Sequence, residues 1–258
     1  MKVAVAGAGG RMGRALIEAV QAERDLVLAA ALDLAGSAAL GQKAGGVQIG
    51  SDISAAVQAC DVLIDFTRPE GTLAHLAACA ARGRAIVVGT TGFTPAQVDT
   101  LREASKRIPI ALSPNFAVAV NVLFKLAETA ARALGEAYDV EIIEAHHRHK
   151  VDAPSGTALK LGEVIARALD RDLKKVAVFG REGDTGERPA KAIGFHALRG
   201  GDIVGEHTVL FAGTGERLEL TVRSQSRATY AQGAVRAAKW LEGRPPGLYD
   251  MFDVLGLR

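Results

Sequence analysis

The sequence predicts an α/β protein with a second domain of α+β type. In the first half, short runs rich in Val, Ile, Leu and Ala alternate with Ala-rich stretches of helical spacing. Buried strands that alternate with helices are typical of a parallel sheet covered on both faces. The second half carries three strand-like segments separated by glycine-rich connections, which favours a mainly antiparallel sheet. A chain of 258 residues can form one large domain or two small ones.

The expected elements follow from these patterns in chain order. The first half has expected strands at 3–6, 26–32, 62–66, 85–88 and 108–112, and expected helices at 12–22, 71–81 and 95–106. The second half has expected helices at 118–134, 158–169 and 230–240, and expected strands at 140–143, 192–198, 206–211 and 218–223.

Composition limits the functions that are open to the chain. Hydrophobic residues make up 48% and charged residues 23%, as in ordinary globular proteins. A formal charge of +2 is too small to favour nucleic-acid binding by itself, so any basic site is local. The start of the chain lacks the pattern of a signal peptide, and no apolar run is long enough to span a bilayer, so we expect a cytoplasmic protein. Cys60 and Cys79 form no C-x-x-C pair and are expected to be reduced and buried.

A glycine-rich loop follows the first expected strand. Gly7, Gly10 and Gly13 are spaced G-x-x-G-x-x-G, whereas the commoner G-x-G-x-x-G would need glycine at Met12. Glycine permits a tight turn and a close approach to a pyrophosphate, and the following helix start directs N–H groups at that anion. Asp33 ends the second expected strand, where a carboxylate binds ribose hydroxyls. The combination predicts a Rossmann-type dinucleotide-binding domain rather than a glycine turn that only packs a helix on a strand.

The residues around Asp33 bear on the choice of cofactor. Leu34 follows it, so no adjacent Arg or Lys is placed to bind a 2′-phosphate, which Asp33 itself would repel. This favours NADH, although Arg11 and Lys43 leave NADPH open.

Two later strand ends carry small and hydroxylated residues. Gly89-Thr90-Thr91-Gly92 follows one expected strand, and Ser113-Pro114-Asn115-Phe116 follows another. Ligands of open parallel sheets lie outside the carboxyl ends of the strands, so these segments could approach the ribose and the nicotinamide. Taken alone, each is equally compatible with an ordinary capped turn.

The segment 144–157 concentrates ionisable residues, including three of the six histidines of the chain. A zinc site is disfavoured, because Arg148 and Lys150 would repel a cation and no Cys or second His cluster completes a ligand set. A nucleic-acid patch is disfavoured because aromatic residues are absent from the segment. A solvated charged loop is the remaining alternative to a functional site. The segment reads Glu-Ala-His-His-Arg-His-Lys-Val-Asp-Ala-Pro-Ser-Gly-Thr.

This pattern favours a site for an anionic substrate. Lys150 and the histidines would attract carboxylates, and the turn Ser155-Gly156-Thr157 would offer N–H groups and a hydroxyl at a helix start. A histidine with a near-neutral pKa can donate a proton as charge develops. A nicotinamide-dependent reductase needs this pairing, since the cofactor gives a hydride and an acid gives the proton.

The segment Glu144–Thr157 resembles the signature of the dihydrodipicolinate reductase (4-hydroxy-tetrahydrodipicolinate reductase) family of lysine and diaminopimelate biosynthesis. The resemblance covers essentially the whole chain, and several motifs in the same order are more specific than any one of them. The further motifs are Gly7–Gly13, Asp65-Phe66-Thr67-Arg68-Pro69-Glu70, Gly89-Thr90-Thr91-Gly92, Asn115-Phe116 and Gly201-Asp202-Ile203-Val204-Gly205-Glu206-His207.

The resemblance implies roles for individual residues. His146 corresponds to the family's proton donor and acceptor, and Lys150 to its second catalytic proton donor. His147 corresponds to a substrate contact, and Gly156 and Thr157 to the turn that binds a carboxylate. No metal is implied. The implied cofactor contacts are Gly7, Ala8, Gly9, Gly10, Arg11, Met12, Asp33, Gly89, Thr90, Thr91, Ser113, Pro114, Asn115 and Phe116.

The resemblance also implies an activity and an organisation. The family reduces a cyclic, conjugated imine dicarboxylate to tetrahydrodipicolinate, with loss of water from the hydroxylated substrate. The implied domains are a dinucleotide-binding domain of residues 1–117 and 227–258, closed by the C-terminal helix, and a substrate-binding and oligomerisation domain of residues 118–226 whose sheet builds a homotetramer. The expected partner is the small dicarboxylate, with neither nucleic acid nor membrane.

Departures from the family pattern are few. Leu34 stands where some members carry a basic residue, Ser113-Pro114 replaces a common Ala-rich pair, and Val222 lies where histidine is frequent. None of them falls in the segment 144–157.

Two other functions compete with this interpretation. The first is another two-domain dehydrogenase with a His/Lys site, acting on an amino acid or a sugar. The Pro-Ser-Gly-Thr turn beside the cationic cluster argues against sugars, which carry no carboxylates. The second is a catalytically idle nucleotide-sensing protein, which would have lost its acid or gained a partner-binding module. His146 and Lys150 are present, and no spare domain exists.

Overall fold

The computed structural model describes residues 1–258, which divide into two compact units. The first unit comprises Met1–Val118 and Arg227–Arg258, and the second comprises Ala119–Ser226. None of the helices combines the length and the hydropathy that a membrane span requires. Cys60 and Cys79 are both free and buried, as expected, and burial raises the pKa of the Cys60 thiol to about 11.

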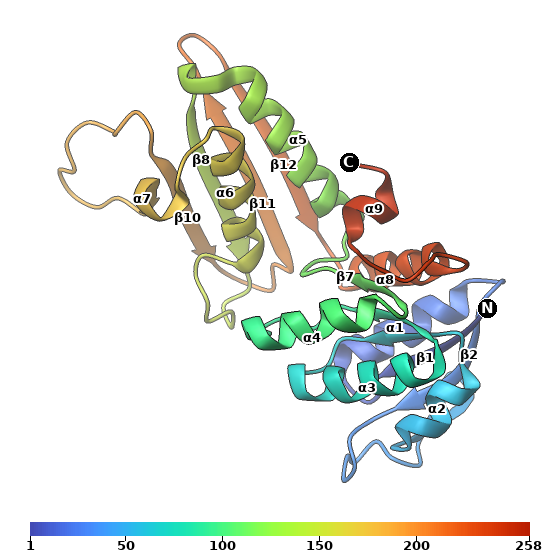
Figure 1. Ribbon diagram of the computed structural model, residues 1–258. Coiled ribbons are helices and arrows are strands. Elements are labelled where there is room, and N and C mark those ends of the chain that lie inside the picture. The colour runs from blue at the N-terminus through green and yellow to red at the C-terminus, as the bar shows by residue number, and fades with distance from the viewer. The chain divides into compact units, whose positions relative to one another are not determined.

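An eight-stranded sheet forms the middle of the first unit (Figure 1). Its order is β13-β7-β6-β5-β1-β2-β4-β3, and every pairing is parallel except that between β3 and β4. The chain builds outward from β1 on one side and then on the other, as in doubly wound dinucleotide folds. The predicted Rossmann-type parallel sheet is confirmed. The strands are β1 (Lys2–Ala6), β2 (Val27–Leu32), β3 (Lys43–Ala44), β4 (Val47–Gly50), β5 (Val62–Asp65), β6 (Ala85–Val88), β7 (Pro109–Leu112) and β13 (Gly247–Tyr249).

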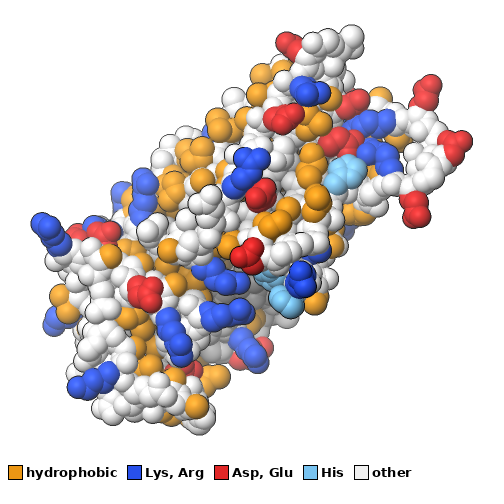
Figure 2. All heavy atoms as spheres, turned by 180° about the vertical axis from the view of Figure 1, so that it is seen from behind, with side chains coloured by type: hydrophobic (Ala, Val, Ile, Leu, Met, Phe, Trp, Pro, Cys, Tyr) orange, Lys and Arg blue, Asp and Glu red, His pale blue; other side chains and the backbone are white.

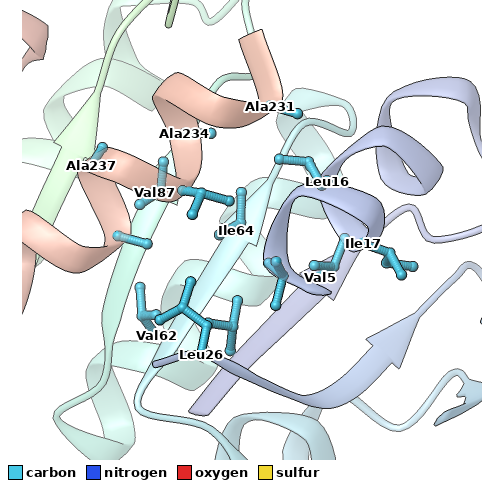
Figure 3. Packing of buried hydrophobic residues seen from close by; sticks show 14 of the residues in the cluster. Val5, Leu16, Ile17, Leu26, Val62, Ile64, Val87, Ala231, Ala234 and Ala237 are labelled. Atoms are coloured by element: carbon cyan, nitrogen blue, oxygen red, sulfur yellow. The ribbon is translucent and has the colours of Figure 1, made fainter. Parts of the chain in front are cut away.

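Helices cover both faces of this sheet, and each face has its own apolar core. Along β1, Val3 and Val5 belong to one core and Ala4 to the other, because successive side chains of a strand point to opposite faces. Figure 3 shows the first core, with Val5 and Ile64 on strands of the sheet and Leu16 on the helix that covers them. The first core includes residues of α1 (Arg11–Ala22), α8 (Ala228–Leu241) and α9 (Met251–Leu255), and the second includes residues of α2 (Ile53–Ala59), α3 (Pro69–Arg82) and α4 (Pro95–Ser105).

Helix α8 enters the first core although it follows the whole second unit in the sequence. Ala231, Ala234 and Ala237 are fully buried in that core (Figure 3). A Cβ atom at Gly233 would lie 1.8 Å from the carbonyl oxygen of Phe116, so only glycine allows this approach. The small side chains of α8 therefore make the C-terminal segment an integral layer of the first unit.

The second unit contains a five-stranded sheet of order β12-β11-β8-β10-β9. Strand β8 pairs antiparallel with β11, and β11 antiparallel with β12, while β10 runs parallel to β8 and to β9. This is the predicted α+β architecture, in which β9 and β10 add two parallel pairings to the two antiparallel ones. The strands are β8 (Asp139–His146), β9 (Ala177–Phe179), β10 (Ile193–Arg199), β11 (Gly205–Ala212) and β12 (Arg217–Ser224), and the helices are α5 (Val118–Leu134), η1 (Gly135–Ala137), α6 (Gly156–Ala168) and α7 (Leu173–Val176).

The two faces of this second sheet differ in burial. Every second residue of β8 is buried, from Val140 through Ile142 and Glu144 to His146, and the residues between them are only half-buried. The buried face is the one on which α6 packs, since a Cβ atom at Gly162 of α6 would lie 2.4 Å from the Phe195 ring, and Phe195 is the cross-strand neighbour of Ile142. Figure 2 shows the molecule from behind, where hydrophobic side chains are scattered among charged ones.

Several observed elements differ from the sequence-based expectation. Strand β8 continues to His146 instead of ending at 143, because Glu144 and His146 are polar residues on its buried face and hide the apolar alternation. Helix α3 begins at Pro69 rather than at 71, where proline fits the first helical turn. The short elements β3, β4, α2, α7, β9, β13 and α9 were not expected, since two to seven residues carry too little periodicity to detect.

Candidate active site

The glycine-rich loop after β1 forms a tight turn in the first unit. Gly7 has a φ of +70°, and its carbonyl oxygen accepts a hydrogen bond from the Gly10 N–H at 3.0 Å. A Cβ atom at Gly13 would lie 2.0 Å from the same oxygen, so α1 can pack against the turn only with glycine there. The G-x-x-G-x-x-G spacing thus has a steric cause at its first and last positions.

The carboxylate of Asp33 lies against this loop at the end of β2. The Gly9 N–H donates to its Oδ2 and the Leu34 N–H to its Oδ1, both at 2.8 Å. A Cβ atom at Gly9 would lie 2.7 Å from that Oδ2, so glycine is required for the contact. The Leu34 side chain is 71% exposed, and no basic side chain bonds to Asp33.

The start of α1 fits a dinucleotide pyrophosphate. Gly10 is its N-cap and carries no side chain to bond the first N–H groups of this twelve-residue helix. Those groups and the positive end of the helix dipole are therefore available to an anion. Gly10 and Arg11 are exposed, Met12 is half-buried, and Ala8 is fully buried below the loop.

The other two predicted cofactor segments follow β6 and β7. Because β1, β2, β5, β6 and β7 are parallel neighbours, their carboxyl ends share one edge of the sheet. Thr91 and Pro114 are exposed at this edge. The Thr90 side chain is buried and accepts a hydrogen bond of 2.8 Å from the Thr72 hydroxyl, so it joins this loop to α3.

The side chains after β7 are also engaged within the first unit. The buried Ser113 hydroxyl donates to the Asn115 carbonyl oxygen at 2.9 Å, and the Asn115 side chain accepts from the Ala117 N–H at 2.8 Å. The buried Phe116 ring packs on Phe66, with centroids 5.4 Å apart. A Cβ atom at Gly89 would lie 2.1 Å from the Phe66 ring, so that ring fits closely under the second loop as well.

A buried polar cluster at the end of β5 was not predicted. Asp65 is fully buried, and its carboxylate accepts from the Thr67 N–H at 2.8 Å, from the Thr67 hydroxyl at 2.7 Å and from His75 Nδ1 at 2.7 Å. The Thr67 methyl group lies 3.1 Å from where a Cβ of Gly7 would be. The cluster thus supports the glycine turn from one side. The motif Asp65–Glu70 marked this place in the sequence, but only the fold brings His75 to it.

In the second unit, His146 is the last residue of β8 and lies on the buried face of the sheet. Its side chain is 10% exposed, and Nδ1 lies 2.6 Å from Glu144 Oε2. Burial lowers the pKa of His146, the Glu144 carboxylate raises it in part, and Lys150 and Arg199 lower it further. The net pKa is below the usual value of 6.5.

Glu144 was left without a role by the sequence, and its carboxylate is 1% exposed. Arg199, at the end of β10, binds it with two hydrogen bonds of 2.8 Å, and the Ser155 N–H donates to Oε1 at 3.0 Å. Burial would raise the pKa of Glu144, but Arg199, His146 and the Ser155 N–H outweigh it and hold this pKa below its usual range. The carboxylate therefore stays ionised and joins three segments: β8, β10 and the start of α6.

Ser155 and His207 form a second contact at the start of α6. The Ser155 hydroxyl caps the helix by accepting from the Ala158 N–H at 3.2 Å, and it lies 3.0 Å from His207 Nε2. The His207 and His146 rings pack edge to face at 5.2 Å. Burial lowers the pKa of His207 to about 4, and His146 adds to the effect. The Ser155 hydroxyl, which the sequence assigned to an anion, is thus 2% exposed and serves the helix and His207.

The remaining predicted residues lie in the loop between β8 and α6. Lys150 Nζ is 2.9 Å from an Asp152 carboxylate oxygen. The buried Nδ1 of His147 makes no hydrogen bond, and the His147 ring lies 6.2 Å from that of His149. Gly156 is exposed at the first turn of α6 and Thr157 is half-buried there.

This loop is tied to the turn after β10. The Arg148 N–H donates to the Gly201 carbonyl oxygen at 3.3 Å, and the Gly200 N–H donates to the His146 carbonyl oxygen at 2.9 Å. The structure thus brings His146, Lys150 and the start of α6 into one region of the second unit. No group of three or more His, Cys, Asp or Glu is arranged to hold a metal ion.

Comparison with known proteins decides the family. Models described as dihydrodipicolinate reductase, N-terminus and C-terminus, match residues 1–116 and 119–255. The chain belongs to the dihydrodipicolinate reductase family. It is 58% identical to the 4-hydroxy-tetrahydrodipicolinate reductases of Thiobacillus denitrificans and Nitrosomonas europaea, over all of this chain and 99% of each relative. The resemblance found in the sequence is confirmed.

Solved structures agree with this assignment. Dipicolinate-bound dihydrodipicolinate reductase from Paenisporosarcina sp. TG-14 has a TM-score of 0.80 and 26% identity, covering 98% of both chains. A probable dehydrogenase from Thermotoga maritima, with a TM-score of 0.61 and 13% identity, shares the fold alone. Family membership makes the chain an oxidoreductase that uses NADH or NADPH, and it decides against the amino-acid or sugar dehydrogenase and against the idle sensor.

The buried His207 gives the second unit a pH-dependent stability. Its folded pKa of about 4 is below the usual 6.5, so the unfolded chain binds more protons between these values. The free energy of unfolding therefore decreases as the pH falls through this window. We expect His207→Gln to weaken that decrease, measured by urea unfolding at pH 7 and pH 5. His149→Gln, at an exposed position, is the control that should keep the wild-type dependence. Equal pH dependence of His207→Gln and wild type would contradict the burial argument.

Proposed function

We propose that this protein reduces 4-hydroxy-tetrahydrodipicolinate (dihydrodipicolinate) to tetrahydrodipicolinate in lysine and diaminopimelate biosynthesis, with His146 and Lys150 as its proton donors. Family membership supports the reaction. One observation in the structure carries the assignment of the site: His146 is held by an ionised carboxylate beside Lys150 and a helix start. An acid next to an anion-binding turn is what the reduction of a dicarboxylate needs.

The second unit has cationic and N–H groups suited to two carboxylates. Lys150 supplies a charge, and His147 has a buried ring nitrogen without a partner. Gly156 and Thr157 form the first turn of a thirteen-residue helix, where N–H groups and the helix dipole favour an anion. We assign His147, Gly156 and Thr157 to substrate binding.

Substrate binding would adjust the protonation of His146. Its pKa lies below the usual value, so the ring is mainly neutral near pH 7. A dianion bound beside it favours the protonated form, because an opposite charge nearby raises a histidine pKa. His146 then holds a proton at Nε2 when the substrate is present.

The reaction divides between the two units. Loss of water from the hydroxylated substrate gives the conjugated ring, and a reduced nicotinamide, when bound, would supply a hydride to it. His146 or Lys150 then gives a proton to the electron pair displaced in the ring, which completes the reduction. We assign residues 1–117 and 227–258 to dinucleotide binding, through Gly7–Met12, Asp33, Gly89–Thr91 and Ser113–Phe116, and residues 118–226 to substrate binding and oligomerisation.

Replacement of Lys150 tests the catalytic assignment. Lys150→Ala should lower kcat by about a hundredfold to ten-thousandfold, the usual contribution of a positioned proton donor, with cofactor affinity unchanged. The assay follows cofactor oxidation in a coupled reaction with the synthase that makes the substrate. Lys160→Ala is the matched control, since Lys160 lies on α6 and pairs only with Glu163. Near-normal turnover of Lys150→Ala would refute the role of Lys150.

We propose NADH as the preferred cofactor. The Asp33 carboxylate lies at the glycine loop with one backbone N–H on each oxygen, which leaves lone pairs for ribose hydroxyls. Its charge would repel a 2′-phosphate, and the exposed neighbour Leu34 offers no compensating cation.

The cofactor preference is measured as kcat/KM with NADH divided by kcat/KM with NADPH. This ratio should exceed one for the wild type and fall by roughly tenfold to a hundredfold in Asp33→Ala, because a charged hydrogen bond contributes about 1.5–3 kcal/mol. Asp52→Ala, at an exposed helix cap, is the control. A strong wild-type preference for NADPH would overturn this proposal.

We also propose that the chain forms a homotetramer in the cytoplasm. The open face of the second sheet, opposite α6, carries Ile143, Ala145 and Leu210, with Leu198 53% exposed beside them. A sheet face with apolar side chains favours burial against other subunits. The use of a nicotinamide cofactor and the two free, buried cysteines are in keeping with a reducing compartment.

Light scattering tests the assembly. The wild type should give about four times the chain mass of 26.9 kDa. Leu198→Glu should give smaller species, because it introduces a charge into the open face, whereas Leu34→Glu at another exposed leucine should not. A monomeric wild type would exclude the tetramer.

A further inference from the structure

The Glu144 carboxylate determines which ring nitrogen of His146 carries hydrogen. Its oxygens accept four hydrogen bonds, from His146, from Ser155 and twice from Arg199. An ionised carboxylate has no hydrogen to donate, so Nδ1 of His146 must be the donor in the 2.6 Å contact. In the neutral ring the lone pair is then on Nε2.

Nε2 lies on the other side of the His146 ring. Nε2 makes no hydrogen bond in the structure, whereas Nδ1 is fixed by Glu144. A Cβ atom at Gly205 would lie 3.1 Å from Nε2, so a larger residue at this position of β11 would cover that atom. Glycine at 205 thus places no side chain against Nε2.

We propose that Glu144 is a positioning residue for the reduction, because it fixes the tautomer and the orientation of the His146 ring. Through its hydrogen bond from the Ser155 N–H, the same carboxylate also holds the first turn of α6 in place. The inference rests on the proposed function of His146. Glu144 itself is placed to touch neither substrate nor cofactor, since all of its acceptor positions are taken by protein groups.

Arg199 supports this role of Glu144 through two hydrogen bonds to its carboxylate. A buried carboxylate without a partner takes up a proton, and a protonated Glu144 could donate to Nδ1 and reverse the tautomer. The two parallel bonds from the guanidinium keep Glu144 ionised and hold its plane. Arg199 also donates to the Asp152 carbonyl oxygen at 2.6 Å, which joins the loop that carries Lys150 to the same carboxylate.

The charges around His146 predict the sign of the effect on its protonation. Glu144 from β8 favours the protonated ring, while burial, Lys150 from the loop and Arg199 from β10 disfavour it. His207 from β11 faces the ring and is itself neutral above pH about 4. Removal of the Glu144 charge leaves only the disfavouring influences, so the pKa of His146 must fall.

Strand β8 contains a matched control for Glu144. Glu141 lies three residues earlier on the opposite, open face of the sheet. Its carboxylate also pairs with two arginines, Arg181 and Arg188, and with a histidine, His196 Nε2 at 2.7 Å. Burial would raise the pKa of Glu141, but these partners hold it at about 2. Loss of Glu141 therefore removes a similar network from the same strand without touching His146.

The first measurement is the tautomer of the His146 ring, read from ¹⁵N chemical shifts and assigned with His146→Gln. We expect the Nδ1–H form in the wild type above the pKa of His146. In Glu144→Gln, the amide NH₂ group facing Nδ1 should convert the ring to the Nε2–H form, and in Glu141→Gln the ring should stay as in the wild type. An Nε2–H tautomer in the wild type overturns the proposal, whether or not Glu144→Gln folds.

The second measurement is the pH profile of kcat. In Glu144→Gln, kcat near pH 7 should fall by about tenfold to a hundredfold, as when partners that orient metal-bound histidines are removed. The limb on which activity is lost with rising pH should move to lower pH, and the dissociation constant for NADH should not change. Glu141→Gln should lower stability and keep the wild-type limb. A Glu144→Gln profile equal to the wild type overturns the proposal.

The two proposals fail in different ways. If the wild type does not oxidise NADH or NADPH with the synthase product, the proposed function fails, while the tautomer measurement still decides the role of Glu144. If the wild type is active and Glu144→Gln keeps both tautomer and pH limb, only the positioning role is wrong.

Discussion

The second unit depends on one buried carboxylate. Glu144 is 1% exposed, and an ionised group at that depth is stable only when its hydrogen bonds are complete. Two come from Arg199 at the end of β10, one from His146 two residues along β8, and one from Ser155 at the start of α6. The requirement to satisfy this group fixes three segments that are far apart in the sequence. It also places a histidine, a lysine-bearing loop and a helix start around one point.

The first unit obeys a steric constraint rather than an electrostatic one. Gly13 and Gly233 each allow a helix to approach a carbonyl oxygen to a distance at which no Cβ atom fits. The first contact packs α1 on the glycine turn, and the second packs α8 on Phe116. Because α8 lies after residue 226, the first unit is complete only when the chain has passed through the second unit and returned.

Charge is arranged differently in the two units. The first unit presents Asp33 and an uncapped helix start side by side, so a carboxylate lies next to the positive end of a helix dipole. The second unit balances its buried glutamate with Arg199, and Lys150 in the neighbouring loop pairs with Asp152. A net charge of +2 conceals both patterns, since it averages over the whole chain.

Local chemistry was enough to determine much of this protein from its sequence. The parallel sheet and its glycine loop were predicted from the alternation of strands with helices, from the glycine spacing and from Asp33. Each of these signals lies within a few neighbouring residues. The cluster of histidines beside Lys150 drew attention to the segment that contains the buried Glu144, since unusual residue types remain visible without a fold. The tertiary structure alone decided which groups satisfy each buried charge. Glu144 pairs with Arg199 and Asp65 with His75, across 55 and 10 residues, and no pattern along the chain records a contact that sheet pairing or a helix turn creates. The strand ending at His146 was underestimated for the same reason: its polar inward residues are stable only beside partners supplied by β10 and α6.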